Sequence, residues 1–333
     1  MNEKKQCKID VAVLMIFFCR VEKTREVFEA VKKARPSKLY LYQDGAREFV
    51  ESDKANIEKC REVVADIDWD CEVHRLYQEK NYGCDPSEYL AQRWFFDNED
   101  SGIVLEDDDV PAQAFFPFCK ELLERYKDNE KINMICGMNN NDVSKDIKES
   151  YLFTKLGSIW GWASWRRVID TWDKDYMWLD DPAKIAIIKK NYCKYCDVEG
   201  YLNVAREHKN TGRAHYESIN AAAMYLYDRV NIVPKYNMIK NIGINQESTH
   251  SVADIRLLPR RTQKLLYKKV YEIDFPLVHP EKIEINERFE KRMTTTKFQQ
   301  KCDSIESSFR ALRYKGVKGL KQKIKKHNER KRG

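Results

Sequence analysis

The segment Ser101–Phe116, with the sequence SGIVLEDDDVPAQAFF, decides how the rest of the chain is understood. It begins with the apolar run Ile103 to Leu105, which is typical of a strand buried on both faces of a parallel sheet. Four acids, 106 to 109, follow directly, and Pro111 ends the strand before an apolar-periodic helix. Ligands bind at the carboxyl ends of strands in open α/β sheets, so these acids stand where chemistry is expected.

The acidic run also indicates which ligand it would hold. Crowded carboxylates repel one another unless a cation neutralises them, and their hard oxygen atoms suit Mg²⁺ or Mn²⁺. The run therefore predicts a site for a divalent ion and a diphosphate. A solvated acidic turn is the alternative interpretation, and the buried strand directly before the acids favours the site.

Strand and helix patterns alternate five times before residue 139, and the connections are long enough for crossover helices. This alternation predicts an α/β fold in which helices flank both faces of a mostly parallel, Rossmann-like sheet. Residues 231–234 are expected to form a short edge strand because proline is tolerated there. The expected strands are 11–18, 38–42, 71–77, 103–105 and 132–136, and the expected helices are 22–34, 49–65, 86–96 and 115–126.

The composition describes a globular protein of one large or two modest domains, with 333 residues, 42% hydrophobic and 34% charged. The apolar run Val11 to Cys19 is too short to span a bilayer and has no small-residue cleavage site. We therefore expect neither a signal peptide nor a transmembrane helix, and a cytoplasmic location. The ten cysteines form no disulfide framework and are expected to be reduced. Cys193 and Cys196 have the spacing of half a zinc site, but no second pair lies nearby, which favours an ordinary structural role.

The positive charge of the chain is concentrated at its end. The net charge is +7, and residues 310–333 alone contribute +10, which leaves −3 for the rest. A nearly neutral body argues against nucleic acid as the main partner. Apolar residues among the lysines and arginines of this tail predict an amphipathic segment that lies at an anionic membrane surface, here the inner face of the cell membrane. A disordered basic tail is the alternative. We expect residues 256–333 to form this helical, basic extension to a catalytic domain at 1–255.

The segment 158–167, SIWGWASWRR, concentrates three tryptophans and two arginines. Burial in the core explains most such clusters. An aromatic wall beside a polar site also binds the apolar faces of sugars and bases, and arginines can neutralise phosphates. We therefore count Trp160 and Trp162 among the candidates for binding a sugar donor.

These motifs together resemble glycosyltransferases of the GT-A fold. The chain is similar to the nucleotide-diphospho-sugar transferases of bacterial surface-polysaccharide clusters and, more distantly, to N-acetylglucosaminyltransferase I. The resemblance covers roughly residues 11–251 and rests mainly on LEDDDVPAQAFF, WGWASWRR and NIGINQESTH, together with Arg20 and the QDG of residues 43–45.

The resemblance implies roles for the polar residues that follow the first strands. It places Arg20 and Asp44 on the base and ribose of the donor, and Asn81 and Gly83 along the nucleotide or sugar. A polar turn, NYGC, carries these last two residues.

The acidic run receives roles in the same way. Glu106 and Asp107 are expected to hold the ribose and order the site, and Asp108 to bind the metal. Asp109 occupies a variable position and counts as a neighbour only. His250 is expected to approach the metal or the diphosphate, with a turn-capping histidine as the alternative.

The resemblance also suggests the catalytic base. Many bacterial relatives have a Trp-Asp pair where this chain has Tyr216-Glu217, so Glu217 is the candidate. Its extra methylene, compared with aspartate, moves the carboxylate by more than about one ångström, which is a departure from the family pattern at the position of the base. Asp180 and Asp181 are the alternatives, because they follow Trp178 in a way that loosely resembles the acidic pair of the eukaryotic enzyme.

The expected activity is transfer of a sugar from a nucleoside-diphosphate donor, a UDP-sugar by preference, to a saccharide or lipid-linked acceptor in cell-envelope polysaccharide synthesis. One base and no evident covalent nucleophile favour inversion. A sugar-1-phosphate nucleotidyltransferase is the nearest alternative, although no glycine-rich loop follows the first strand. A two-metal hydrolase would need a scattered His/Asp ligand set that we do not find. A non-catalytic module that binds membrane surfaces is the remaining alternative.

Overall fold

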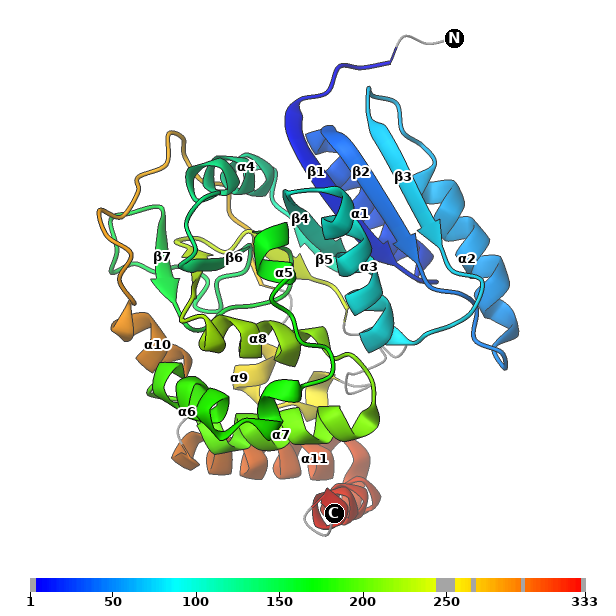
Figure 1. The fold of residues 1–333 in the computed structure, drawn as a ribbon. Helices are drawn as coiled ribbons and strands as arrows, with labels where there is room; N and C mark the ends of the chain where they lie inside the picture. The colour runs from blue at the N-terminus through cyan, green and yellow to red at the C-terminus, as the bar shows by residue number, and fades with distance from the viewer. Residues whose placement is uncertain (1–3, 244–254, 265–267, 295–296, 331–333) are drawn as a thin grey trace.

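The computed structural model describes residues 4–243, 255–264, 268–294 and 297–330, with side chains placed up to residue 317 except at 255, 297, 298 and 300. Its centre is a mostly parallel sheet of eight strands in the order β3-β2-β1-β4-β8-β6-β9-β7 (Figure 1). The α/β fold expected from the sequence is therefore confirmed. The strands are β1 Ile9–Phe17, β2 Pro36–Gln43, β3 Glu72–Tyr77, β4 Ser101–Glu106, β6 Ile132–Cys136, β7 Tyr151–Thr154, β8 Trp162–Trp165 and β9 Val230–Pro234.

Helices cover both faces of this sheet because its inner strands are apolar on both faces. Alternate residues of β1 pack into two different cores: Val13 and Met15 face one, and Leu14 and Ile16 face the other. The first core receives α1, α2 and α4, the second receives α3 and α6 to α8, and α5 contributes one residue to each. These helices are α1 Val21–Ala34, α2 Glu51–Val64, α3 Cys84–Asn98, α4 Phe115–Arg125, α5 Arg166–Ile169, α6 Pro182–Asn191, α7 Val198–Thr211 and α8 Tyr216–Leu226, with a 3-10 turn, η1 Met177–Asp180, before α6.

Parallel pairing brings the ends of three strands to one edge of the sheet. Ile16 of β1 lies opposite both Tyr42 of β2 and Glu106 of β4. The chain segments that follow these three strands therefore emerge at the same level, and they carry most of the polar residues singled out in the sequence.

The strand β8 is the main feature that the sequence pattern did not predict. It inserts antiparallel between β4 and β6, with Trp162 opposite both Val104 and Cys136. The tryptophan-rich segment thus forms an inner strand of the sheet. The prediction of an edge strand at 231–234 was also wrong, because β9 lies between β6 and β7. Pro234 is tolerated there because it is the last residue of the strand, where only a terminal ladder donor is missing.

A second, two-stranded sheet extends the acidic run. Its strands are β5 Asp109–Pro111 and β10 Ile239–Asn241, which pair antiparallel with Asn241 opposite Asp109. This pairing fixes the direction in which the chain leaves β4, and it brings a segment more than 100 residues away in sequence against the acids.

The segment after residue 255 is partly joined to the main core. Leu277 and Phe289 are buried in the two core clusters, and the backbone N–H of Asn286 donates to the carbonyl of Phe153 at 2.8 Å. The boundary at residue 255 stays a prediction. The helical elements of the segment after residue 254 are η2 Ile255–Leu257, α9 Arg260–Gln263, α10 Glu287–Met293 and α11 Lys297–Arg330. The last is interrupted at Gly316, where φ is 62°.

The helical character expected for the basic tail is confirmed, since α11 runs to Arg330. α11 contacts η2, and Figure 1 shows it well away from the edge strand β3. None of the helices in the described ranges combines the length and apolar character needed to cross a membrane.

Candidate functional site

The acidic run is buried and is not a solvated turn. Glu106 ends β4, and Asp107, Asp108 and Asp109 follow with exposed fractions of 2%, 8% and 0%. Buried carboxylates are tolerated only when they are paired, hydrogen-bonded or protonated. The surroundings of each acid therefore show how the site compensates for the charge.

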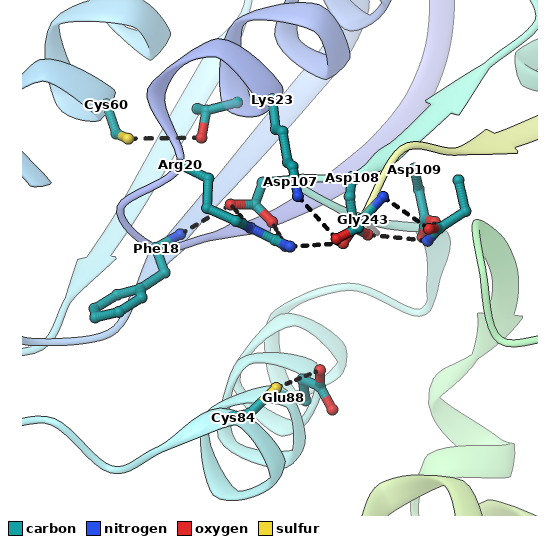
Figure 2. A network of polar contacts seen from close by, with 12 residues as sticks. Phe18, Arg20, Lys23, Cys60, Cys84, Glu88, Asp107, Asp108, Asp109 and Gly243 are labelled. Carbon is teal, nitrogen blue, oxygen red and sulfur yellow. Dashed lines mark hydrogen bonds and ion pairs between the residues drawn. The ribbon is translucent and has the colours of Figure 1, made fainter. Parts of the chain in front are cut away.

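Arg20 compensates for two of the acids. It lies directly before α1, and its guanidinium makes two contacts with the Asp107 carboxylate and donates from Nη1 to Asp108 Oδ2 at 2.8 Å (Figure 2). The backbone N–H of Phe18 also donates to Asp107 Oδ2, at 3.4 Å. The predicted nucleotide residue Arg20 is thus brought onto the acidic run, where it binds carboxylates directly.

Asp109 forms hydrogen bonds with two chain segments that lie beside the acidic run. Its carboxylate accepts from Gly161 N at 2.8 Å and from Asn241 Nδ2 at 3.2 Å, and the same Asn241 amide donates to Asp108 Oδ1 at 3.1 Å. Gly161 has φ of 60°, a left-handed conformation that turns the chain into β8. Sequence analysis counted Asp109 only as a neighbour because it occupies a variable position in the family pattern, and the partners found here are distant in sequence.

A cavity of ≈ 310 Å³ opens beside the acidic run, between the ends of β1 and β2 and the start of α3. This volume is at the lower end of the range for small-molecule sites. Figure 2 shows Arg20 and the acids facing the first turn of α3, which carries Cys84 and Glu88. Six of the residues predicted from the sequence line the cavity: Arg20, Asp44, Asn81, Gly83, Glu106 and Asp107.

Asp44 organises the wall of this cavity. Its carboxylate accepts from the side chain of Asn81 at 2.9 Å and from the backbone N–H groups of Tyr82 and Gly83 at 2.9 and 3.0 Å. Burial raises its pKa, although these donors oppose the shift. A side chain at Gly45 would lie 2.5 Å from the backbone of Lys80, which explains the glycine after Asp44. The aspartate of the QDG motif therefore connects the loop that follows β2 to the loop that follows β3.

The base candidate Glu217 lies beside this cavity in a cluster of acids. It is in the first turn of α8, and its carboxylate oxygen lies within 4.8 Å of ligand oxygens from Asp85 and Glu88 of α3. Glu88 also lines the cavity, so the cluster connects Glu217 to the predicted nucleotide site. His215 Nδ1 lies 3.3 Å from Asp85 Oδ1 on the far side of the cluster.

Sequence analysis missed Asp85 and Glu88, although both stand at the start of the helix expected at 86–96. Their position after the third strand of a parallel sheet was the available signal, since helices that follow such strands begin at the ligand-binding edge. Tyr42 and Ser87 also line the cavity and were missed.

The electrostatics of the site favour the binding of a cation. Burial, followed by the charge of neighbouring acids, raises the pKa of Glu106 and Asp109 well above the usual range. The same two causes raise the pKa of Glu88 to about 8, with Glu217 as its main charged neighbour. Burial also raises the pKa of Asp108, even though Arg20 opposes the shift. A divalent cation would relieve this excess of negative charge, and the all-oxygen donor set fits Mg²⁺ or Mn²⁺.

Other predicted residues lie outside the cavity. Trp162 is 2% exposed and stacks on Phe96 with ring centroids 6.2 Å apart, and Trp160 packs against the first core. Asp180 pairs with Lys209 at 2.6 Å, and Asp181 caps α6 by accepting from Ala183 N at 2.9 Å. A tryptophan role in donor binding stays a prediction. His250 lies outside the described residues.

Comparisons with known proteins leave the family of this chain open. No family model matches the sequence, and no curated protein matches it. Among solved structures, the apo form of a UDP-glucose pyrophosphorylase matches with 10% identity, covering 70% of this chain and 93% of that chain at a TM-score of 0.34. A UDP-glucose pyrophosphorylase complexed with UDP-glucose matches with 9% identity over 68% and 91%, also at 0.34. At this level of similarity the matches carry no argument about activity.

Proposed function

We propose that this protein is a metal-dependent glycosyltransferase that moves a sugar from a nucleoside-diphosphate donor, a UDP-sugar by preference, to a saccharide or lipid-linked acceptor. The observation that carries the proposal is a buried acidic run beside a ≈ 310 Å³ cavity lined by six residues that the resemblance assigned to the nucleotide. These residues come from the ends of four adjacent parallel strands, β3, β2, β1 and β4, and the loops that follow them, where α/β proteins bind their ligands.

Asp108 would hold the divalent ion. The support is its raised pKa, its burial and a donor set made of oxygen atoms only. When bound, such an ion supplies neutralisation of the charge that grows on a departing diphosphate. Arg20, which already lies between Asp107 and Asp108, would contribute positive charge at the same place.

Glu217 would act as the base. Its carboxylate would accept the proton of an acceptor hydroxyl as the oxygen attacks the anomeric carbon, and the bond to the diphosphate would break on the opposite side. A single base of this kind gives inversion and contributes about 10²- to 10⁴-fold. Burial and the charge of Glu217 raise the pKa of Glu88, which favours a single negative charge on this pair of carboxylates.

Donor turnover by matched variants tests these assignments. Release of nucleoside diphosphate from UDP-sugars should require a divalent ion and should stop with EDTA. Asp108→Asn and Glu217→Gln should each reduce it by at least about 10²-fold, while Asp180→Asn, at an exposed ion pair, should leave it unchanged. Normal turnover by Glu217→Gln would remove that residue from the mechanism, and loss in Asp180→Asn would move the base to the Asp180–Asp181 pair.

The same assay separates the nearest alternative. A sugar-1-phosphate nucleotidyltransferase would release pyrophosphate from a nucleoside triphosphate and a sugar 1-phosphate. The solved structures reported above are pyrophosphorylases, but a TM-score of 0.34 does not decide between the two activities. In favour of the transferase, the connection 18–20 between β1 and α1 contains no glycine and instead holds Arg20 against the acids. Pyrophosphate release would overturn the proposal.

The acceptor is proposed from the charge of α11. This helix is rich in lysine and arginine and exposes Ile305 and Phe309 at 58% and 68%. Such a surface suits the anionic inner face of the cell membrane, where lipid-linked saccharides are assembled.

A further inference from the structure

Two cysteines between α6 and α7 lie close enough to form a disulfide. The backbone N–H of Cys196 donates to the carbonyl of Cys193 at 2.9 Å, which closes a turn from residue i to i+3. Such turns hold the outer Cα atoms within about 7 Å, and disulfides span about 4.4–6.8 Å between Cα atoms. The turn therefore places both thiols in reach of each other without movement of the helices.

The two thiols differ in access. Cys193 is 2% exposed, and its thiol donates to Glu290 Oε2 of α10 at 3.4 Å. Cys196 is partly exposed, contacts Thr294 Oγ1 at 3.7 Å and lines a cavity of ≈ 300 Å³. One sulfur is thus open to a small molecule, and the second lies behind it. This is the arrangement required for an attacking thiol and a resolving thiol.

The hydrogen bonding of the pair activates the accessible sulfur. The Cys193 thiol has one proton, which it can donate to Glu290 or to Cys196, and hydrogen bonding to Cys196 lowers the pKa of Cys196 to about 7, against the effect of burial. The same hydrogen bond and burial raise the pKa of Cys193. Burial raises the pKa of the other described cysteines for which a shift is resolved, which are Cys19, Cys60, Cys71, Cys84, Cys119 and Cys136.

The described residues around this pair do not complete a zinc site. Within the described ranges, only Asp85, Glu88 and Glu217 bring three metal-ligand side chains within 4.8 Å of one another. Zinc sites of structural type need four ligands, so the geometry favours thiol chemistry over metal binding.

We propose that Cys193 and Cys196 form a dithiol–disulfide site that exchanges with small disulfides of the glutathione class. The Cys196 thiolate attacks one sulfur of the oxidised molecule, forms a mixed disulfide and releases one thiolate. Cys193 then attacks the Cys196 sulfur, and the second thiol leaves with the proton of Cys193. The protein loses two electrons and two protons, and the small disulfide is reduced to two thiols. The cavity beside Cys196 shares no lining residue with the acidic cavity, and this proposal does not depend on the proposed sugar transfer.

Oxidation would also affect how α10 packs against the rest of the protein. Glu290 is 2% exposed and accepts from Thr154 Oγ1 at 3.0 Å, from Lys155 N at 2.7 Å and from the Cys193 thiol. A disulfide removes the third donor and leaves a buried carboxylate less well satisfied. We therefore expect faster amide hydrogen exchange in α10 after oxidation.

The expected reactivity follows from the lowered pKa. The lowered pKa gives Cys196 a larger thiolate fraction near neutral pH than an ordinary cysteine of pKa about 8.5 has. Its lower basicity offsets part of this advantage, because nucleophilicity falls as the pKa falls. The rate of alkylation at Cys196 should rise with a midpoint near pH 7.

Incubation with oxidised glutathione, followed by peptide mass spectrometry, tests the site. The native protein should gain an internal Cys193–Cys196 disulfide, and Cys193→Ser, which cannot resolve, should accumulate one glutathionyl group on Cys196. Cys196→Ser should lose both products. Cys302→Ser, at an exposed cysteine of α11, is the matched control and should behave as native.

Two results would overturn the proposal. One is a native protein that carries glutathione on Cys196 without closing the disulfide. The other is a native protein whose Cys196 reacts no faster than its Cys302. Because the native time course needs no substitution, the test does not depend on the folding of any variant.

Discussion

Replacing Arg20 by methionine should show how much of the stability of the protein depends on neutralising the acidic run. The guanidinium contacts Asp107 and Asp108, whose side chains are only 3% and 11% exposed, and is itself 21% exposed. Methionine keeps part of the apolar stem and removes the charge. Both carboxylates then remain buried without their cation, which is the costly way to break a buried ion pair.

The expected cost is about 3 kcal/mol in the free energy of unfolding. Breaking a fully buried pair costs about 3–5 kcal/mol, and the partial exposure of Arg20 places this case at the lower end. The Asn241 amide and the Phe18 N–H stay in place and retain part of the hydrogen bonding of the two acids. At roughly 2 °C per kcal/mol for a chain of this size, the melting temperature should fall by about 6 °C.

Urea and thermal unfolding of Arg20→Met measure this cost, and Arg93→Met is the matched control. Arg93 pairs with Asp97 and Asp170 at the surface, where those acids are 57% and 50% exposed, so its loss should cost under about 1 kcal/mol. Equal costs for the two variants would refute the conclusion that Arg20 compensates for buried charge.

The pH dependence provides a second check of the same reasoning. Burial raises the pKa of Asp108 in the native state, so that group favours folding below the ordinary carboxyl pKa of about 4 and loses this contribution as pH rises through its raised value. Removing Arg20 raises the pKa of Asp108 further. The difference in the free energy of unfolding between the native protein and Arg20→Met should therefore be largest near pH 7 and become smaller toward pH 4. Mn²⁺ at about 100 times its dissociation constant should restore about 2.7 kcal/mol near pH 7.

Two further predictions concern packing and the tail. A methyl group at Gly102 in β4 would lie 2.3 Å from Phe95 Cζ. Gly102→Ala should therefore lower the free energy of unfolding in urea by about 2 kcal/mol, and by less in a Phe95→Leu background. An equal loss in that background would show that the Phe95 ring is not the obstacle. Deleting residues 310–333 removes a net charge of +10 and should abolish sedimentation with anionic vesicles while leaving neutral vesicles unaffected. Unchanged sedimentation would place membrane binding elsewhere.

Local patterns carried most of the information about the site. The run Ile103 to Asp109 predicted a buried strand with acids at its end, and the structure has β4 ending at Glu106 with the acids buried behind it. Alternating strands and helices predicted a mostly parallel sheet, and Arg20, Asp44 and Glu106, which end or follow three of its strands, all line one cavity. These inferences succeeded because hydrophobic periodicity and chain direction depend on near neighbours in the sequence.

The sequence by itself determined the class of fold, the parallel strands that carry the polar residues and the helical nature of the basic tail. Only the tertiary structure placed β8 between β4 and β6, set Asn241 against Asp109, and brought Glu88 beside Glu217. Those contacts join segments separated by tens to more than a hundred residues. Their partners are chosen by how whole helices and sheets pack together, and no local pattern of residues records that choice.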